Sequence, residues 1–123
     1  MTIEHRDLAA GRWATLSLAE QLGNIGSEVS RAIGWKPKNA ALSERALHRA
    51  LELFDLTLAD PRLLRAPARL RELARAREVT ADFLVGPNQY RSTAASLQQY
   101  FDAYALAARA RATSRTPPTP PPA

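Results

Sequence analysis

The clearest alternation of apolar and polar positions lies between Ser17 and Lys36. Apolar residues recur there at steps of three or four, the spacing that places them on one face of a helix. Ser17 and Glu20 have the spacing of a capping box, which marks a helix start. The segment therefore predicts an amphipathic helix whose apolar stripe is made of Leu18, Leu22, Ile25, Val29, Ala32 and Ile33.

A second stripe, made of small residues, runs beside the apolar one: Gly23, Ser27, Ser30 and Gly34. A glycine inside a helix costs about 1 kcal/mol relative to alanine, and this helix has three, Gly23, Gly26 and Gly34. Close approach of a neighbouring helix would offset that cost. We therefore interpret the segment as a core helix buried on two sides rather than as a ligand site. The expected helix-packing or oligomer-packing positions are Gly23, Gly26, Ser27 and Ser30.

The second predicted helix starts between Asn39 and Ser43, either of which can cap it, and stops at Asp60. Asp60 can then cap a short turn that begins with Pro61, since proline is favoured at the first position of a helix. The apolar face of the second helix is Leu47, Ala50, Leu51, Phe54 and Leu58.

The third predicted helix starts at Pro67 and runs to about Val85, where a Gly-Pro pair ends it. Ser92 is predicted to cap the fourth helix. We expect Tyr90 and Tyr100 to pack at the ends of the helices with their hydroxyls in water. The inward stripe of the fourth helix is Leu97, Phe101, Tyr104, Ala105 and Ala108.

Four capped helices of about 17–20 residues, joined by short breaks, predict an all-α fold, an antiparallel up-down-up-down four-helix bundle. The length of 123 residues suits one such domain. The bundle is expected over residues 13–112, after a flexible arm at residues 1–12. Residues 113–123 are rich in proline, which predicts a disordered or polyproline II tail.

Composition narrows the classes of function. The chain has no cysteine, which excludes disulfides, thiolate catalysis and thiolate zinc sites. No apolar run approaches the roughly 20 residues of a membrane span, and the N-terminal region lacks the apolar core of a signal peptide. We therefore expect a cytoplasmic protein without membrane contact. The net charge is +5, and residues 62–77 account for the excess, because they hold six arginines and one acid, Glu72.

Residues that could perform chemistry are sparse. Glu44 and His48 lie one turn apart, but ferritin-like metal sites need a Glu-x-x-His pair twice, and His5 is the only other histidine. Glu78 and Asp82 share a helix face without an activating partner. The sequence contains no nucleophilic triad, phosphate-binding glycine loop or zinc-ligand spacing. We therefore predict a protein that is not an enzyme and that uses no metal and no cofactor.

The arginine-rich segment carries the most functional information. Five of its side chains are expected along one side of the third helix and its lead-in, where they could neutralise phosphates: Arg62, Arg65, Arg69, Arg71 and Arg75. The alternative is a solvated charged face that keeps the protein soluble. Some charges are expected to be paired, since Arg75 precedes Glu78 by three residues. Arg77 falls on the apolar face, where we expect it to pair with a buried acid.

A resemblance to a known family rests on Trp13 and on residues 17–29, 50–62, 77–79, 86–90 and 96–101. These segments are similar to small bacterial four-helix-bundle proteins, the accessory variability determinant group and its relatives encoded in 23S rRNA intervening sequences. The resemblance covers roughly residues 13–109. It implies a pentameric barrel with a basic surface, which works with the reverse transcriptase of a diversity-generating retroelement and its template RNA. It implies no catalytic residue.

The sequence thus favours a non-enzymatic, homo-oligomeric helical bundle that binds RNA or DNA, or a nucleic-acid enzyme, through its arginines. The pentamer and the reverse transcriptase follow from the resemblance alone. The alternative is a protein–protein adaptor or scaffold without nucleic-acid contact, in which the small-residue stripe and the proline-rich tail engage a partner.

Overall fold

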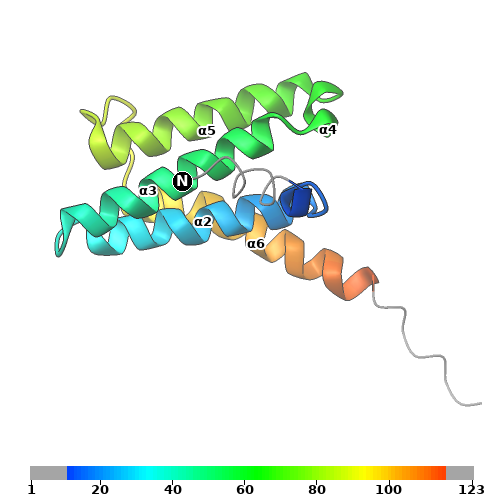
Figure 1. Cartoon of the computed structure of the whole chain (residues 1–123), viewed down its shortest axis with the longest axis horizontal. Helices are drawn as coiled ribbons and strands as arrows, with labels where there is room; N and C mark the ends of the chain where they lie inside the picture. Colours follow the sequence, from blue (N-terminus) through cyan, green and yellow to red (C-terminus); the bar gives the residue numbers. More distant parts are fainter. Residues whose placement is uncertain (1–10, 116–123) are drawn as a thin grey trace, which may run out of the picture.

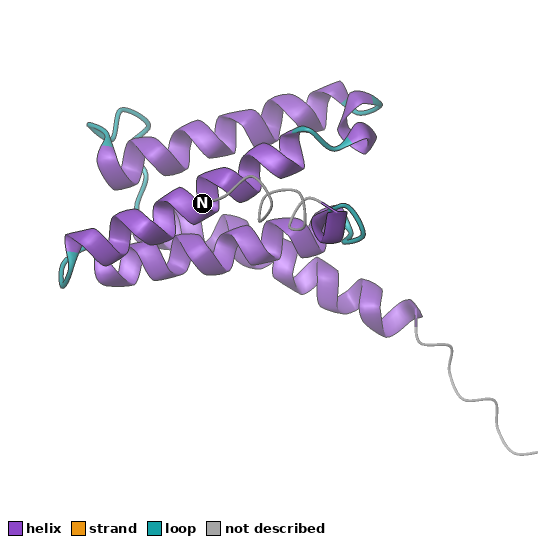
Figure 2. Ribbon diagram, viewed as in Figure 1, coloured by secondary structure: helices purple, strands orange, loops and turns teal. Residues whose placement is uncertain are grey.

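The computed structural model describes residues 11–115, with side chains up to residue 110. Within that range the protein is all-α and has no strand, which confirms the predicted fold class. Short loops join the helices (Figure 2). None of these helices is long and apolar enough to cross a membrane. The helices after a first helical turn at residues 11–13 are α2 (Leu18–Trp35), α3 (Ala40–Leu58), α4 (Pro61–Leu64), α5 (Pro67–Val85) and α6 (Ala94–Arg115).

The predicted N-terminal arm and C-terminal tail lie largely outside the described residues, which leave out 1–10 and 116–123. Helix α6 continues through Arg115. The start of the segment predicted as the tail, residues 113–115, is therefore helical.

Side-chain caps set where three of the helices start. In the predicted capping box, the backbone nitrogen of Glu20 donates to Ser17 Oγ, and the backbone nitrogen of Ser17 donates to Glu20 Oε1, both at 3.1 Å. Asn39 caps α3 through its side-chain oxygen. Asp60 caps α4 by accepting a hydrogen bond of 2.9 Å from the backbone nitrogen of Arg62. These caps confirm the predicted starts, because each accepts a hydrogen bond from an N–H group that has no partner within its helix.

The predicted cap of the last helix is wrong by one residue. Thr93 and Ser96 bond reciprocally: the backbone nitrogen of Ser96 donates to Thr93 Oγ1, and that of Thr93 donates to Ser96 Oγ, both at 3.0 Å. The backbone nitrogen of Ser92 instead donates to Asn88 Oδ1 at 2.9 Å. Asn88 has φ 57°, a left-handed backbone that asparagine tolerates well. Ser92 is thereby held in the loop, and the cap falls to the next residue.

Helix α2 lies at the centre of the arrangement. It runs beside α3 in the opposite direction and also packs against α6, while α5 packs mainly on α3 (Figure 1). Helices α5 and α6 are joined by hydrogen bonds between polar and aromatic side chains. The C-terminal part of α6 extends beyond the other helices (Figure 1), and Leu106 is 65% exposed.

The core lies among the four long helices. The ring of Phe54 on α3 is fully buried and lies 6.0 Å from the ring of Phe101 on α6, edge to face. Burying such a side chain contributes roughly 1.5–3 kcal/mol. Helix α5 adds Leu73, and α4 adds Leu63. The stripe predicted for the first long helix is confirmed, since its buried members are Leu22, Ile25, Val29 and Ala32.

Candidate nucleic-acid interface

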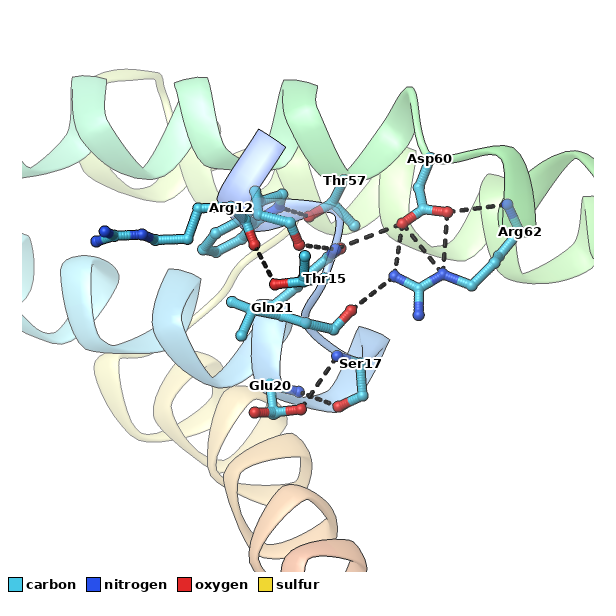
Figure 3. A network of polar contacts seen from close by, with 10 residues as sticks. Arg12, Thr15, Ser17, Glu20, Gln21, Thr57, Asp60 and Arg62 are labelled. Atoms are coloured by element: carbon cyan, nitrogen blue, oxygen red, sulfur yellow. Dashed lines mark hydrogen bonds and ion pairs between the residues drawn. The ribbon is translucent and has the colours of Figure 1, made fainter. Parts of the chain in front are cut away.

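Two of the six arginines of residues 62–77 form ion pairs with carboxylates, and four form none with the described residues. Arg62 is the first of them and lies in α4, where it pairs with the buried Asp60 through Nη2 and Oδ2 at 2.6 Å. Its Nη2 also donates to the backbone oxygen of Leu16 at 2.8 Å (Figure 3). These bonds lower the pKa of Asp60 to about 2, and the side-chain hydrogen bond from Arg62 is the largest cause. Arg62 was predicted to contact phosphates, but its donors are used to hold the start of α4.

Arg62 bonds to a cluster of buried side chains, Trp13, Gln21, Thr57 and Asp60, and we call these five residues the anchoring network (Figure 3 labels all but Trp13). Trp13 Nε1 donates to Thr57 Oγ1 at 2.9 Å. Gln21 Nε2 donates to the backbone oxygen of Trp13 at 2.9 Å and to Asp60 Oδ2 at 3.4 Å. The network fastens the segment before α2 onto α3 and α4. Most of its hydrogen bonds join residues that are far apart in sequence, so no local sequence pattern marks it.

Arg77 also has a carboxylate partner. Its Nε lies 2.9 Å from Asp55 Oδ1, and its Nη2 lies 3.3 Å from Asp55 Oδ2. The expectation of a buried acid is wrong, because the side chain of Asp55 is 61% exposed. Asp55 follows the buried Phe54 on α3, so the helix turns its carboxylate outward.

The other four arginines make no ion pair with the residues that the structure describes: Arg65, Arg69, Arg71 and Arg75. All four are exposed. Arg69 Nη1 donates to the Tyr104 hydroxyl at 3.1 Å, and the Arg69 guanidinium lies 6.0 Å from the Tyr104 ring centre. The guanidinium of Arg75 lies 5.4 Å from the centre of the Tyr90 ring. These two arginines therefore contact aromatic rings instead of carboxylates.

The four arginines do not form one strip along α5. At about 100° per residue, Arg71 and Arg75 are only about 40° apart around the helix, and Arg75 lines the groove toward α6. Arg69 points toward α6, where it meets Tyr104. The structure thus brings Arg69 and Arg75 to the two sides of the boundary between α5 and α6, and it leaves Arg65 and Arg71 in solvent.

Two of the acids on α5, Glu72 and Glu78, accept hydrogen bonds from tyrosine hydroxyls. Glu72 Oε1 accepts hydrogen bonds from the hydroxyls of Tyr100 at 3.1 Å and Tyr104 at 2.9 Å. Glu78 Oε2 accepts one from the Tyr90 hydroxyl at 3.2 Å. Burial is the main cause that raises the pKa of Tyr100 and of Tyr104, so both remain protonated donors. The hydroxyls of Tyr90 and Tyr100, predicted to lie in water, take part in exposed hydrogen bonds to Glu78 and Glu72.

We call this surface the tyrosine face. It consists of Arg69, Glu72, Arg75, Glu78, Tyr90, Tyr100 and Tyr104. A groove of about 280 Å³ lies beside it, between α5 and α6. Glu72 and Arg75 line the groove, and its floor is apolar and made of Ala76, Val79, Leu97 and Phe101. Such a floor with a few polar groups around it is typical of ligand sites.

Two glycines of α2, Gly23 and Gly26, face α6 of the same chain, whereas Gly34 is exposed and faces nothing within 4 Å. A β-carbon at Gly26 would lie 2.5 Å from Phe101 Cβ, and one at Gly23 would lie 3.5 Å from Ala105 Cα. Ser27 and Ser30 are exposed and line a second groove of about 380 Å³ between α2 and α6. The close approach at Gly26 explains why that position takes no side chain.

Among residues 11–110, the acidic and histidine side chains do not gather into a group of three that could hold a metal. Glu44 and His48 are both exposed. Asp82, which was predicted to share a helix face with Glu78, accepts hydrogen bonds from the backbone nitrogens of Gln89 and Tyr90.

Comparisons with protein-family models, with curated proteins and with solved structures find no match to this chain. The resemblance to the accessory variability determinant group therefore stays a prediction.

Proposed function

We propose that this protein is a non-enzymatic helical bundle that binds nucleic acid through Arg65, Arg69, Arg71 and Arg75. The proposal treats the four long helices as one up-down-up-down unit that presents these arginines. One observation carries it: the carboxylates of Glu72 and Glu78 accept hydrogen bonds from tyrosines, while these arginines have no ion-pair partner among the described residues.

The physical argument is electrostatic. An exposed guanidinium that is not paired with a carboxylate is available to bind a phosphate and to release its counterions. Arginine suits this role because its planar N–H groups match the oxygens of a phosphate. Contacts of this kind hold the nucleic-acid backbone without reading its sequence. The net charge of +5 supports the same partner.

Fluorescence anisotropy with labelled single-stranded and duplex RNA and DNA tests the proposal over a range of salt. The test variant is Arg71→Gln/Arg75→Gln. Removing two phosphate contacts should flatten the slope of log affinity against log salt by about 1.4–1.8. The matched control is Arg31→Gln/Arg49→Gln, which removes the same charge from two arginines that are paired with Glu28. Absence of binding at low salt, or equal slopes for the two variants, would overturn the proposal.

We also propose that the protein is a homo-oligomer, with a pentamer and a reverse-transcriptase partner suggested by the resemblance. Exposed apolar side chains at Leu64, Val85 and Leu106 support assembly. Light scattering measures the mass directly. A species of 13.5 kDa at tens of micromolar would contradict assembly.

A protein–protein adaptor is the second candidate. The observations that favour it are the C-terminal part of α6, which extends beyond the other helices (Figure 1), and the exposed side chain of Leu106 on the same helix. This candidate replaces the first if no nucleic acid binds at low salt.

A further inference from the structure

We propose that the groove between α5 and α6 holds one unpaired base of a single-stranded nucleic acid, and that the base carries an exocyclic amino group. This inference rests on the proposed function and names the class of nucleic acid and the place where it is read. The juxtaposition that supports it is an apolar groove lined by Glu72 and Arg75, with a second arginine, Arg69, farther along α5; both arginines contact aromatic rings.

The groove suits the flat face of a base. Its floor combines the Phe101 ring with the aliphatic side chains of Ala76, Val79 and Leu97, and Tyr100 stands at its side. Proteins that recognise single strands place bases against apolar and aromatic side chains in this way. In a duplex the faces of the bases are stacked on one another, so a duplex offers no face to this floor.

Two polar atoms at the rim suit the edge of the base. Glu72 Oε1 takes the hydrogen bonds of both tyrosines, while Glu72 Oε2 accepts none from the residues that the structure describes. Ser92 also lines the groove, and its hydroxyl is unbonded within the same range. A carboxylate oxygen accepts hydrogen bonds and cannot donate one, so it prefers an edge with an amino group, such as cytosine N4. Uracil has no amino group, and its one donor at this edge, N3–H, lies between two carbonyl oxygens that repel a carboxylate, so uracil should bind less well.

Two arginines of α5 account for the phosphates. Arg75 lines the groove and lies against the Tyr90 ring, while Arg69 lies against Tyr104. They are six residues apart on α5, which is about 9 Å along the axis. A guanidinium held against a ring keeps N–H donors in its plane available for a phosphate oxygen. A strand that places a base in the groove would meet Arg75 beside the base and Arg69 farther along α5.

The test compares oligocytidylate RNA, oligouridylate RNA and an RNA duplex of the same length, each labelled and titrated with the full chain. Ala76→Leu places a larger side chain on the groove floor, and Ala103→Leu makes the same change at an exposed position of α6 outside the groove. Stacking of one base should be worth about tenfold in affinity. We expect Ala76→Leu to weaken oligocytidylate binding about tenfold, with the salt slope unchanged, while Ala103→Leu has no effect.

Glu72→Gln gives a second readout that does not depend on the size of the groove. Loss of the negative charge should strengthen the binding of all three probes, because Glu72 no longer repels their phosphates. The preference for oligocytidylate over oligouridylate should shrink. Circular dichroism shows whether each variant is folded.

Four outcomes are decisive. If no probe binds at low salt, the proposed function and this inference both fail. If all probes bind equally, the inference fails and the proposed function stands. If folded Ala76→Leu binds oligocytidylate as the wild type does, the base lies elsewhere and the inference is wrong. Selective loss of oligocytidylate binding in Ala76→Leu supports it.

Discussion

Arg62 and Arg75 come from the same arginine-rich segment and have opposite environments. The side chain of Arg62 in the anchoring network donates to a carboxylate that is 6% exposed and to the backbone oxygen of Leu16, and the backbone nitrogen of Arg62 donates to the same carboxylate. Arg75 on the tyrosine face meets an exposed aromatic ring and no carboxylate. The two arginines differ in their partners, a carboxylate and an aromatic ring, and in how far water reaches each partner. The residue type alone does not reveal this difference.

The difference separates a role in stability from a role in binding. In the anchoring network the Asp60 carboxylate is 6% exposed, so removing the hydrogen bonds of Arg62 leaves a buried charge without compensation. On the tyrosine face the side chains are exposed, and each interaction there contributes little to folding. An arginine of the second kind keeps its donors available for a ligand. The predictions below test this division.

The largest effect is expected for Asp60→Ala. The substitution removes the cap of α4, worth about 1 kcal/mol, and the charge-assisted hydrogen bonds from Arg62, worth about 2 kcal/mol. We expect the free energy of unfolding to fall by about 3 kcal/mol, measured by urea denaturation. Asp55→Ala is the matched control, because Asp55 also pairs with an arginine but is 61% exposed. Equal losses for the two variants would break the comparison.

The second effect concerns the position of α6, which forms one wall of the groove. Gly26→Ala would place a methyl group 2.5 Å from Phe101 Cβ and 3.1 Å from Phe101 Cγ. Overpacking of this kind costs about 1–3 kcal/mol, more than the helix propensity that alanine adds. Gly34→Ala is the control, since nothing lies within 4 Å of a β-carbon there.

We expect opposite signs for the two alanine variants: a lower melting temperature for Gly26→Ala and a slightly higher one for Gly34→Ala. If Gly26→Ala changes the mass in light scattering and leaves the melting temperature unchanged, the glycine faces another chain instead of α6.

The starts of most helices could be predicted because their signals are local. Each signal lies within one turn of the helix start that it marks. These signals are the capping box at Ser17, the caps at Asn39 and Asp60, and the proline at the first turn of α5, Pro67. The cap at Thr93 was missed because the turn at Asn88, with its left-handed backbone, decides which hydroxyl reaches the helix.

The candidate site could be predicted only in part. The sequence pointed to the arginine-rich segment, and four of the five predicted arginines are exposed without an ion-pair partner in the described range. It could not distinguish Arg62, whose partner is brought near by the turn into α4 and by the segment before α2. It also missed the tyrosine face, because Glu72 and Tyr104 meet only when α6 packs beside α5.

The third prediction concerns pH. Asp60 has a pKa of about 2 in the folded protein, against about 3.9 for an unfolded chain. Because the folded value is the lower one, the ionised carboxylate favours the folded state above about pH 4, and this contribution is lost as pH falls toward 2. We expect a loss of about 1–2 kcal/mol over that range. Asp60→Asn should lower stability at neutral pH and flatten the dependence below pH 4. An unchanged slope in this variant would assign the acid sensitivity to another carboxylate.

The smallest effect is expected for Arg77→Gln, and it tests the division most directly. Arg77 has a carboxylate partner, as Arg62 has, but the side chain of that partner, Asp55, is 61% exposed, whereas that of Asp60 is 6% exposed. An exposed pair contributes about 0–1 kcal/mol, whereas breaking a buried pair costs about 3–5 kcal/mol. We expect urea denaturation to show a loss below about 1 kcal/mol. Because Arg77 is paired with α3, the salt slope of oligocytidylate binding should also stay at the wild-type value. A loss above about 3 kcal/mol would show that having a carboxylate partner affects stability more than the exposure of that partner to water. A flatter salt slope would add Arg77 to the nucleic-acid interface.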